Sequence, residues 1–550
     1  MTSRATAFPE LPSTVSERTV PALLRRAAKD APDRCALVAH SLLSGDEASL
    51  SYRELVERSG RFAAALADRG VTHGDRVALL VGNDGALEAH LAYHAVHRLG
   101  AINVPVNTFY LERELEYVVG FSQPKALVFG PSFAETLSGC TWAADAPALL
   151  ELSATARVGE SLPQLIEAST RPTPEVVARE SDEADWIFTS GTTGHPKAVA
   201  LTHAQSVACG HEARHVWGLE SSSVYQNSSP FFTSTGCRTN LLSCLAAGCT
   251  FVVDPEVDAQ AILDRAVRRG TTSMFVLTAI LAILFRRLDD GRLRSLEVPT
   301  LRRLFYGGQT MPRAFHERLE DEFATRQGVQ LGVVYGLTEG GTSGVMLEPA
   351  DHAEAVRRHG PYGMSIGRRG WNEWVQHRIV GEDGGDVAPG EVGEIWLRAP
   401  SVMARYVSAE DATEAALADG WLHTGDMATV DDEGFMFFVD RSKSMIRRGG
   451  MNIAAAEVEA VAMAHPAVAE AAAMGRPNPL LGEDVHLVAV LRTGEALTAA
   501  DLIEFCGKRL AAYKTPRDVT FVGALPHNAM GKVSRAELGS LVATEESSLS

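Results

Sequence analysis

Short apolar segments alternate with amphipathic helical segments along much of the chain, and this alternation restricts the fold more than any other feature. Ser51 and Glu54 form a capping box that predicts a helix ending near Gly70, and a second helix is predicted over Ala86–Arg98. Alternation of this kind is typical of parallel sheets covered by helices, so we expect an α/β fold. The predicted strands are Arg76–Val81, Ile102–Val106, Lys125–Phe129, Cys249–Val253, Ser273–Leu277, Leu301–Tyr306 and Leu331–Tyr335.

The pattern changes near Trp371. Gln376–Val380 and Glu394–Leu397 are predicted to form a hairpin, because the Glu-Asp-Gly-Gly turn signal at 382–385 lies between them. Several more short strands follow, which predicts a β-rich subdomain over about 371–440. At 550 residues the chain is too long for one compact core, so two or more domains are expected.

A small α+β domain is predicted after Asp440, with helices at Ala455–Ala464 and Ala499–Leu510 and a strand near His486–Leu491. We therefore expect a large N-terminal domain over 1–440 and a small C-terminal domain over 441–550.

Composition excludes some function classes. The net charge of −18 argues against a nucleic-acid binder and gives no reason to expect adsorption to an anionic membrane.

The seven cysteines are odd in number and contain no C-x-x-C pair, which favours a reducing compartment. Residues 1–20 have no apolar core typical of a signal peptide, and the longest apolar run, Met274–Phe285, is too short to span a bilayer. A cytoplasmic location is expected.

A loop rich in hydrogen-bond donors follows the predicted strand Asp185–Phe188. Ser190–His195 contains three hydroxyl residues and two glycines, and Lys197 adds a positive charge. The glycines allow close approach of the backbone to a polyphosphate, and successive amides bind anions. The ending differs from a Walker loop because Pro196 precedes the lysine. A phosphate-binding loop is predicted, with a simple turn as the alternative.

This loop is one of several motifs that occur in a fixed order. The string Thr-Ser-Gly-Thr-Thr-Gly-x-Pro-Lys resembles the signature of the adenylate-forming superfamily, which includes acyl-CoA synthetases, peptide-synthetase adenylation domains and luciferases. The resemblance extends from the first helices to the last twenty residues. The further matching motifs are Tyr335-Gly336-Leu337-Thr338-Glu339, Gly420-Trp421-Leu422-His423-Thr424-Gly425-Asp426, Asp440-Arg441-Ser442-Lys443, Gly449-Gly450-Met451-Asn452-Ile453 and Pro526 to Gly531-Lys532.

The resemblance implies a reaction with two halves. A carboxylate attacks the α-phosphate of ATP and releases pyrophosphate, and a thiolate then attacks the acyl adenylate and releases AMP. Such chemistry depends on positioning and charge neutralisation. ATP, Mg²⁺ and coenzyme A are the cofactors and co-substrates implied, and the enzyme is expected to be an AMP-forming acyl-CoA synthetase.

The resemblance also assigns residues to ATP. The β- and γ-phosphates are expected to bind Thr189, Ser190, Gly191, Thr192, Thr193, Gly194 and Lys197. The remaining nucleotide-site residues are Gly308, Gln309, Tyr335 against adenine, Gly336, Asp426 at the ribose hydroxyls, and Arg441 at ribose or phosphate. Thr338 is expected to donate to the α-phosphate, and Glu339 to hold Mg²⁺.

Lys532 is expected to bridge the substrate carboxylate and the α-phosphate as the catalytic lysine. Because Lys532 lies in the small domain, the resemblance implies that this domain rotates about Lys443. The rotation is expected to bring the loop containing Gly450 to the thiol.

The acyl pocket is expected to include Phe232, Thr233, Gly307, Gly340 and Gly341. No acidic residue occurs between Phe231 and Asn240, where amino-acid-activating relatives carry an Asp, so an α-amino acid is disfavoured. Glycines and small hydroxyls at this place suggest room for a bulky or branched acyl group.

The acceptor of the acyl group is the second open question. The Gly449-Gly450 loop resembles that of CoA ligases, whereas an enzyme that passes acyl-AMP to a carrier protein or another partner shares the same first half-reaction. A luciferase-like oxidation and a non-catalytic ATP-binding protein are further alternatives, and Lys532 argues against the last. A homodimer is left open.

One motif points to another enzyme class. His211-Glu212-Ala213-Arg214-His215 is a literal H-E-x-x-H, which on a helix places two zinc ligands on one face. No third ligand follows in the sequence. We therefore interpret it as a polar helix face, on a helix for which Thr202 is the expected N-cap.

Overall fold

Two eight-stranded sheets form the centre of the molecule. The computed structural model describes residues 8–141, 147–189, 196–256, 258–308, 311, 313–341, 344–358, 360, 363–370, 372–441, 445–448, 451–478, 482–510, 512–527 and 533–548. The first sheet has the order β15 (Val345–Leu347), β14 (Gln330–Tyr335), β13 (Arg303–Gly307), β12 (Ser273–Leu277), β10 (Val224–Asn227), β11 (Thr250–Val253), β1 (Cys35–His40) and β2 (Glu47–Ser51). The second has the order β19 (Arg405–Tyr406), β9 (Lys197–Thr202), β8 (Glu183–Thr189), β4 (Ile102–Pro105), β3 (Arg76–Leu80), β5 (Ala126–Phe129), β6 (Ala148–Glu151) and β7 (Glu160–Ser161).

Most neighbouring strands of both sheets are parallel, which confirms the predicted α/β class. Antiparallel pairs occur towards the sheet ends, at β1–β2, β14–β15, β8–β9 and β9–β19. The sequence pattern did not indicate these reversals. The pair β8–β9 matters for function, because it makes the predicted phosphate loop the connection of a hairpin.

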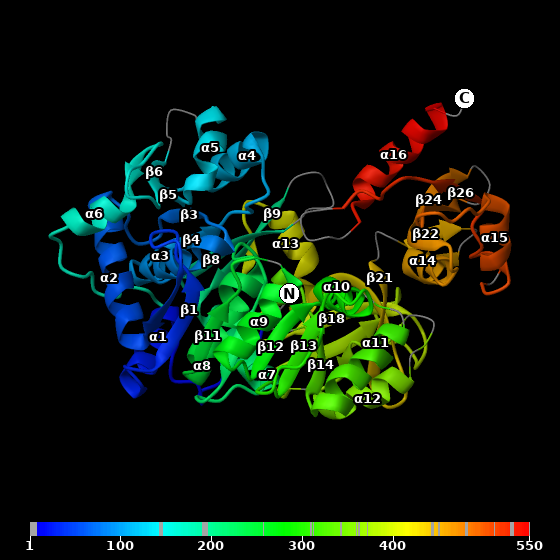
Figure 1. The fold of residues 1–550 in the computed structure, drawn as a ribbon, viewed down its shortest axis with the longest axis horizontal. Helices are drawn as coiled ribbons and strands as arrows, with labels where there is room; N and C mark the ends of the chain where they lie inside the picture. Colours follow the sequence, from blue (N-terminus) through cyan, green and yellow to red (C-terminus); the bar gives the residue numbers. More distant parts are fainter. Residues whose placement is uncertain are drawn as a thin grey trace, which may run out of the picture.

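Helices cover the sheets and fill the space between them (Figure 1). The capping box of Ser51 and Glu54 begins α2 (Tyr52–Asp68), and Thr202 begins α7 (His203–Trp217), both as predicted. The predicted helix Ala86–Arg98 is α3; nearly all of its residues are buried, and its apolar residues belong to the largest core cluster. The other long helices are α1 (Val20–Asp30), α4 (Glu112–Ser122), α8 (Asn240–Ala247), α9 (Ala259–Arg269), α10 (Thr278–Asp289) and α12 (Pro349–Arg357).

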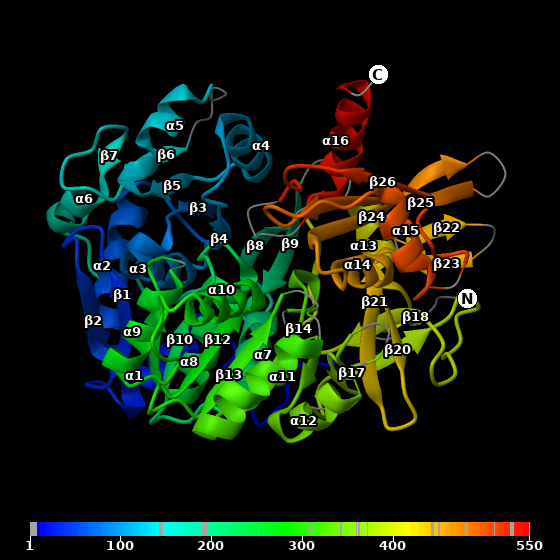
Figure 2. The ribbon, with the colours of Figure 1, turned by 45° about the vertical axis from the view of Figure 1, so that its right-hand side comes forward.

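A third sheet of five antiparallel strands corresponds to the predicted β-rich region. The expected hairpin is present, since β17 (Gln376–Val380) pairs with β18 (Gly393–Arg398). The order of the sheet is β16 (Gly367–Arg368), β21 (Phe435–Arg441), β20 (Leu422–Val430), β18 and β17. In Figure 2 the strands β20 and β21 lie directly below the C-terminal part of the chain.

The C-terminal part has its own sheet and its own core. The core consists of two clusters of buried side chains, one drawn from residues between 446 and 521 and the other from residues between 472 and 542. Its helices α14 (Ala455–Met463) and α15 (Ala499–Gly507) match the predictions, and α16 (Arg535–Ser548) follows. The predicted strand near His486 is the longer β25 (Gly482–Leu491). Its main partner, β24 (Val468–Asn478), was not predicted. The other strands are β22 (Met445–Arg448), β23 (Met451–Ala454) and β26 (Asp518–Phe521).

A hydrogen bond between described residues joins this part to the third sheet. The carboxylate of Asp440, in β21, accepts from the backbone N–H of Ala456 in the first turn of α14 at 3.2 Å. Residues 442–444, between the two elements, lie outside the described ranges. Over the part of the chain that the structure describes, no helix combines the length and apolar character needed to cross a membrane.

Buried histidines on α3 and α7 make the stability of the fold sensitive to acid. Burial lowers the pKa of His90 to about 4 and that of His203 to about 3, and it also lowers the pKa of His94 well below its usual value. Because the unfolded chain takes up protons near pH 6.5 and the folded chain does not, stability falls as pH decreases below 6.5. We expect a loss of about 1.6 kcal/mol for each of His90 and His203 between pH 6.5 and pH 5.

Urea unfolding from pH 8 to pH 5 measures this loss. His90→Leu is expected to flatten the profile, whereas a matched change at the exposed His215 leaves its slope unchanged. A wild-type stability that stays constant from pH 7 to pH 5 contradicts the prediction.

Candidate active site

The predicted phosphate loop connects β8 to β9. Thr189 and Lys197 are paired across this hairpin, and the Thr189 hydroxyl donates to the carbonyl of Lys197 at 3.4 Å. The hydroxyl of Tyr117, from α4, donates to the carbonyl of Pro196 at 3.3 Å. The ends of the loop are therefore held by the sheet and by α4. The loop residues Ser190, Gly191, Thr192, Thr193 and Gly194 lie outside the described residues.

Tyr406 brings a lysine and a carboxylate together beside this loop. The Nζ of Lys197 lies 4.9 Å from the centre of the Tyr406 ring, and the Tyr406 hydroxyl donates to Oε1 of Glu339 at 2.8 Å. The carbonyl of Glu339 accepts from the backbone N–H of Met403 at 2.7 Å, so the acid is held at two points. Thr338 lies in the same short 3-10 helix, Thr338–Gly340. The predicted phosphate and metal residues are thus neighbours.

The role of Tyr406 was not predicted. Tyr406 lies in β19, which pairs with β9, and this pairing places its ring beside Lys197. In the sequence, Tyr406 is an aromatic residue that follows Arg405, in a segment to which no function was given. Only the pairing of two strands about 200 residues apart connects it to the site.

A second group of predicted residues meets where the first and third sheets come together. The hydroxyl of Tyr335, the last residue of β14, donates to Oδ2 of Asp426 in β20 at 2.5 Å. Asp426 is buried, and the Phe438 ring lies 6.0 Å from the Tyr335 ring. Asp426 is paired with Arg441 across β20 and β21. An aromatic ring and an adjacent buried acid suit a nucleoside, with the acid accepting from ribose hydroxyls.

The residues before Asp426 fix its position. The Thr424 hydroxyl donates to the carbonyl of Ile395 at 2.7 Å and accepts from the N–H of Asp426 at 3.1 Å. The N–H of Gly425 donates to Glu394 at 2.7 Å. The Thr-Gly-Asp part of the motif therefore anchors the acid to the neighbouring strand β18.

The predicted acyl-pocket residues fall into two groups. Phe232 is buried, and the hydroxyl of Thr233 donates to the carbonyl of Pro230 at 2.8 Å and accepts from the N–H of Gly236 at 3.0 Å. The ring of Phe109 lies 6.1 Å from that of Phe232, edge to face, and Phe109 is 60% exposed. An exposed aromatic side chain beside the predicted pocket was missed from the sequence.

The glycines of the pocket serve close packing. A Cβ at Gly307 would lie 2.3 Å from the carbonyl oxygen of Val334, and a Cβ at Gly340 would lie 2.7 Å from Leu397. Gly341 has φ +76 and lies against Ser401, whereas Gly308, at φ +109, has Leu277 at an ordinary contact distance. Neighbouring atoms fill the space beside Gly340 and Gly341, so these two glycines do not themselves make room for a large acyl group.

Several predicted residues are not placed. Lys532, Lys443, Gly450 and Gln309 lie outside the described residues, and for Arg441 only the backbone is described.

The H-E-x-x-H motif lies in α7, as expected. The side chain of Glu212 is fully buried, while His211 and His215 line a surface cavity of about 630 Å³ with Arg214 and Arg303. Within the described ranges, no group of three or more His, Cys, Asp or Glu side chains could hold a metal ion.

The helix-covered double sheet carries a lysine and a carboxylate beside a hairpin loop, and an aromatic ring hydrogen-bonded to a buried acid, an arrangement that suits an adenine nucleotide. The profile of the AMP-binding enzyme family matches residues 24–407, and that of the AMP-binding enzyme C-terminal domain matches residues 457–532. The chain belongs to this family, which confirms the resemblance inferred from its motifs.

The curated relatives are similar over nearly their whole length. The chain is 34% identical over 540 residues to the 3-[(3aS,4S,7aS)-7a-methyl-1,5-dioxo-octahydro-1H-inden-4-yl]propanoyl:CoA ligase of Mycobacterium tuberculosis, covering 95% of this chain and 99% of that protein. It is 33% identical to the indoleacetate–CoA ligase of Aromatoleum aromaticum, covering 90% and 94%.

Among solved structures, the o-succinylbenzoate CoA synthetase of Bacillus subtilis bound to its acyl-adenylate intermediate superposes with a TM-score of 0.80 at 27% identity, covering 94% of this chain and 97% of that one. The same synthetase has been solved with ATP and a magnesium ion, and its TM-score in that structure is 0.79.

Proposed function

We infer from the site that Lys197 and Glu339, brought together on Tyr406, hold the polyphosphate of ATP and its metal ion. The protein is an ATP-dependent carboxylate–CoA ligase. A carboxylate oxygen bonds to the α-phosphorus and pyrophosphate leaves; the CoA thiolate then bonds to the acyl carbon and AMP leaves. The observation that carries this function is the Lys197–Tyr406–Glu339 arrangement in a chain whose curated relatives are CoA ligases.

We propose that the other residues take the roles implied by their motifs. The 189–197 loop binds the β- and γ-phosphates, Tyr335 and Asp426 bind the nucleoside, and Thr338 donates to the α-phosphate. Glu339 suits Mg²⁺, because its carboxylate is oriented by the Tyr406 hydroxyl and its backbone carbonyl is held by the N–H of Met403. The magnesium ion, when bound, offsets the charge of the phosphates.

We propose a division at Asp440 into domains 1–440 and 441–550, with Lys443 as the hinge. The separate cores on the two sides of this position support the division. Lys532 of the small domain then reaches the α-phosphate in one orientation, and the loop with Gly450 meets the thiol in the other.

We propose a bulky, ring-bearing acid as the acyl substrate. The exposed ring of Phe109 beside Phe232 offers an apolar contact outside the pocket. The relatives named for an indane-propanoyl group and for indoleacetate also act on ring-bearing acids. No carboxylate occurs in the segment 231–240 to pair with a substrate ammonium.

Pyrophosphate release across a panel of acids, with and without CoA, tests these proposals. We expect release with aryl or polycyclic acids, followed by an acyl-CoA product when CoA is present. Faster turnover of short straight-chain acids contradicts the substrate class. Release without a thioester supports the alternative, an enzyme that passes acyl-AMP to a carrier protein or another partner.

We also propose a cytoplasmic location, and a homodimer is the assembly to be tested. All seven cysteines are free thiols, which suits a reducing compartment. Sedimentation of the purified chain measures its assembly state.

A further inference from the structure

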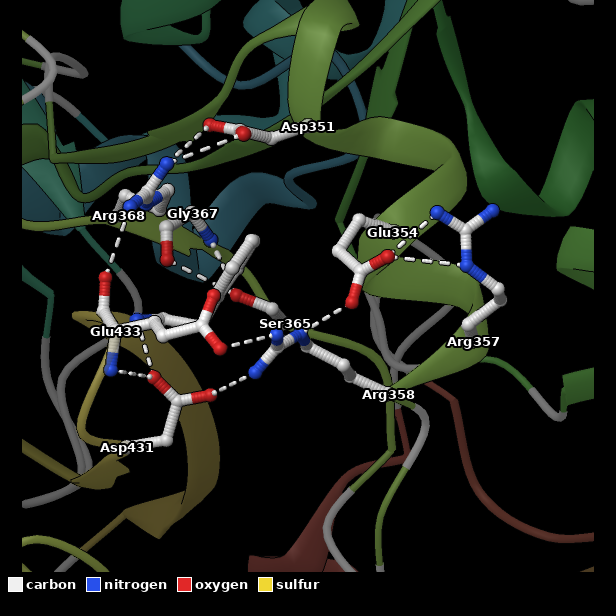
Figure 3. A network of polar contacts seen from close by, with 10 residues as sticks. Asp351, Glu354, Arg357, Arg358, Ser365, Gly367, Arg368, Asp431 and Glu433 are labelled. Carbon is white, nitrogen blue, oxygen red and sulfur yellow. Dashed lines mark hydrogen bonds and ion pairs between the residues drawn. The ribbon is translucent and has the colours of Figure 1, made fainter.

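Helix α12 is tied by ion pairs to the turn between β20 and β21. Arg358, which follows the last residue of α12, lies between three carboxylates (Figure 3). Its guanidinium donates to Glu354 at 2.7 Å, to Asp431 at 3.2 Å and to Glu433 at 2.6 Å. Asp431 and Glu433 belong to the turn, and Asp431 also accepts from the backbone N–H groups of Glu433 and Phe435. The Arg358 side chain therefore joins the turn to the helix at two carboxylates of the turn.

A second arginine repeats this connection. Arg368, in β16, bonds to Asp351 of α12 at 3.2 Å and to the carbonyl of Glu433 at 2.9 Å. The guanidinium groups of Arg358 and Arg368 lie 5.0 and 4.8 Å from the Phe435 ring. Phe435 is buried in one core cluster with α12. Ion pairs of the two arginines and the packing of Phe435 thus both join the hairpin β20–β21 to α12.

The opposite face of α12 is joined to the first sheet. His352 bonds through Nε2 to the hydroxyl of Tyr306 at 2.7 Å and through Nδ1 to Glu320 at 2.5 Å. Tyr306 directly precedes Gly307 at the end of β13, beside β14 and its terminal Tyr335. Helix α12 therefore contacts both structures that form the nucleoside site.

We propose that Arg358 is a positioning residue for nucleotide binding, acting through the β20–β21 hairpin on Asp426; this rests on the proposed function of Asp426. Asp426 lies five residues before Asp431, about 16 Å along the strand, and the ladder between β20 and β21 reaches the pair Asp426–Arg441 with one irregularity, between Met427 and Ala428. A shift of the turn therefore moves Asp426 relative to Tyr335, its hydrogen-bond partner on the other sheet. Misplacement of a binding group by about 1 Å is enough to weaken its action.

The test compares Arg358→Ala with Arg357→Ala. Arg357 is the adjacent residue, and it pairs only with Glu354 of the same helix among the contacts that the structure describes. We expect Arg358→Ala to raise the KM for ATP about tenfold, with kcat and the KM for the acid within about twofold of wild type. Arg357→Ala is expected to match wild type, and Arg358→Lys to recover part of the loss.

Direct binding of ATP by calorimetry, without the acid, repeats the comparison independently of turnover. A matching loss of ATP affinity in Arg358→Ala supports the inference even if no acid of the panel is turned over. The binding experiment therefore distinguishes failure of this inference from failure of the proposed reaction. The inference is overturned if Arg358→Ala binds ATP as wild type does. It is also overturned if the KM values for ATP and acid rise equally with a lowered Tm, because that result describes general destabilisation.

Discussion

Lys532→Ala is expected to lower acid-dependent pyrophosphate release by about a thousandfold while ATP binding changes little. A lysine that bridges the attacking carboxylate and the α-phosphate stabilises charge as the new bond forms. Its contribution is therefore larger in the transition state than in the complex with ATP. In the proposed site the 189–197 loop binds the phosphates without help from Lys532, so affinity for ATP is expected to remain.

Rapid-quench measurement of pyrophosphate and calorimetric titration with ATP separate the two effects. Lys508→Ala is the matched control, because Lys508 is an exposed lysine of the same C-terminal part, paired with Glu504. Equal loss of ATP binding and of pyrophosphate release in Lys532→Ala would contradict the role proposed for Lys532.

Glu339→Gln is expected to lower the same rate by about a hundredfold and to raise the Mg²⁺ concentration needed for half-maximal rate. Glutamine keeps the size of the side chain and one oxygen, but it loses the charge that attracts the metal ion. Tyr406→Phe removes the hydroxyl that orients Glu339 and leaves the ring beside Lys197. We expect this variant to raise the Mg²⁺ requirement about tenfold.

Steady-state rates over a range of Mg²⁺ concentrations measure both variants. Glu410→Gln, at an exposed acid of the helix that follows Tyr406, serves as the control. An unchanged Mg²⁺ dependence in Glu339→Gln would show that the metal ion is held elsewhere.

Local signals in the sequence predicted much of the fold. The capping residues Ser51 and Thr202 begin helices in the structure, and the predicted bounds of α3, β12 and β17 agree with it. These features depend on neighbours within one or two helical turns or on a simple alternation of side chains. The strand β24 was missed, because its segment is rich in alanine and becomes a strand only by pairing with β25.

The candidate site was predicted as a set of motifs, without its geometry. The contact of Tyr406 with Glu339 and that of Tyr335 with Asp426 join residues 67 and 91 positions apart. Such contacts depend on how sheets meet, which a single sequence does not specify. The role of the glycines could not be predicted for the same reason. Gly341 packs against Ser401, which is distant in the sequence, so only the fold shows whether a glycine leaves space or permits close packing.

The hydrogen bond from the N–H of Ala456 to Asp440 stabilises the orientation of the C-terminal part seen in this structure. The first turn of a helix has N–H groups without partners inside the helix, and a side-chain acceptor there contributes about 1 kcal/mol. Here β21 of the third sheet supplies that acceptor to α14. In the proposed rotation about Lys443, α14 moves away from β21 and this bond is lost, so the bond is expected to favour the orientation seen here about fivefold. Under the proposed rotation, the balance between the two orientations, and so between the two half-reactions, would depend in part on Asp440.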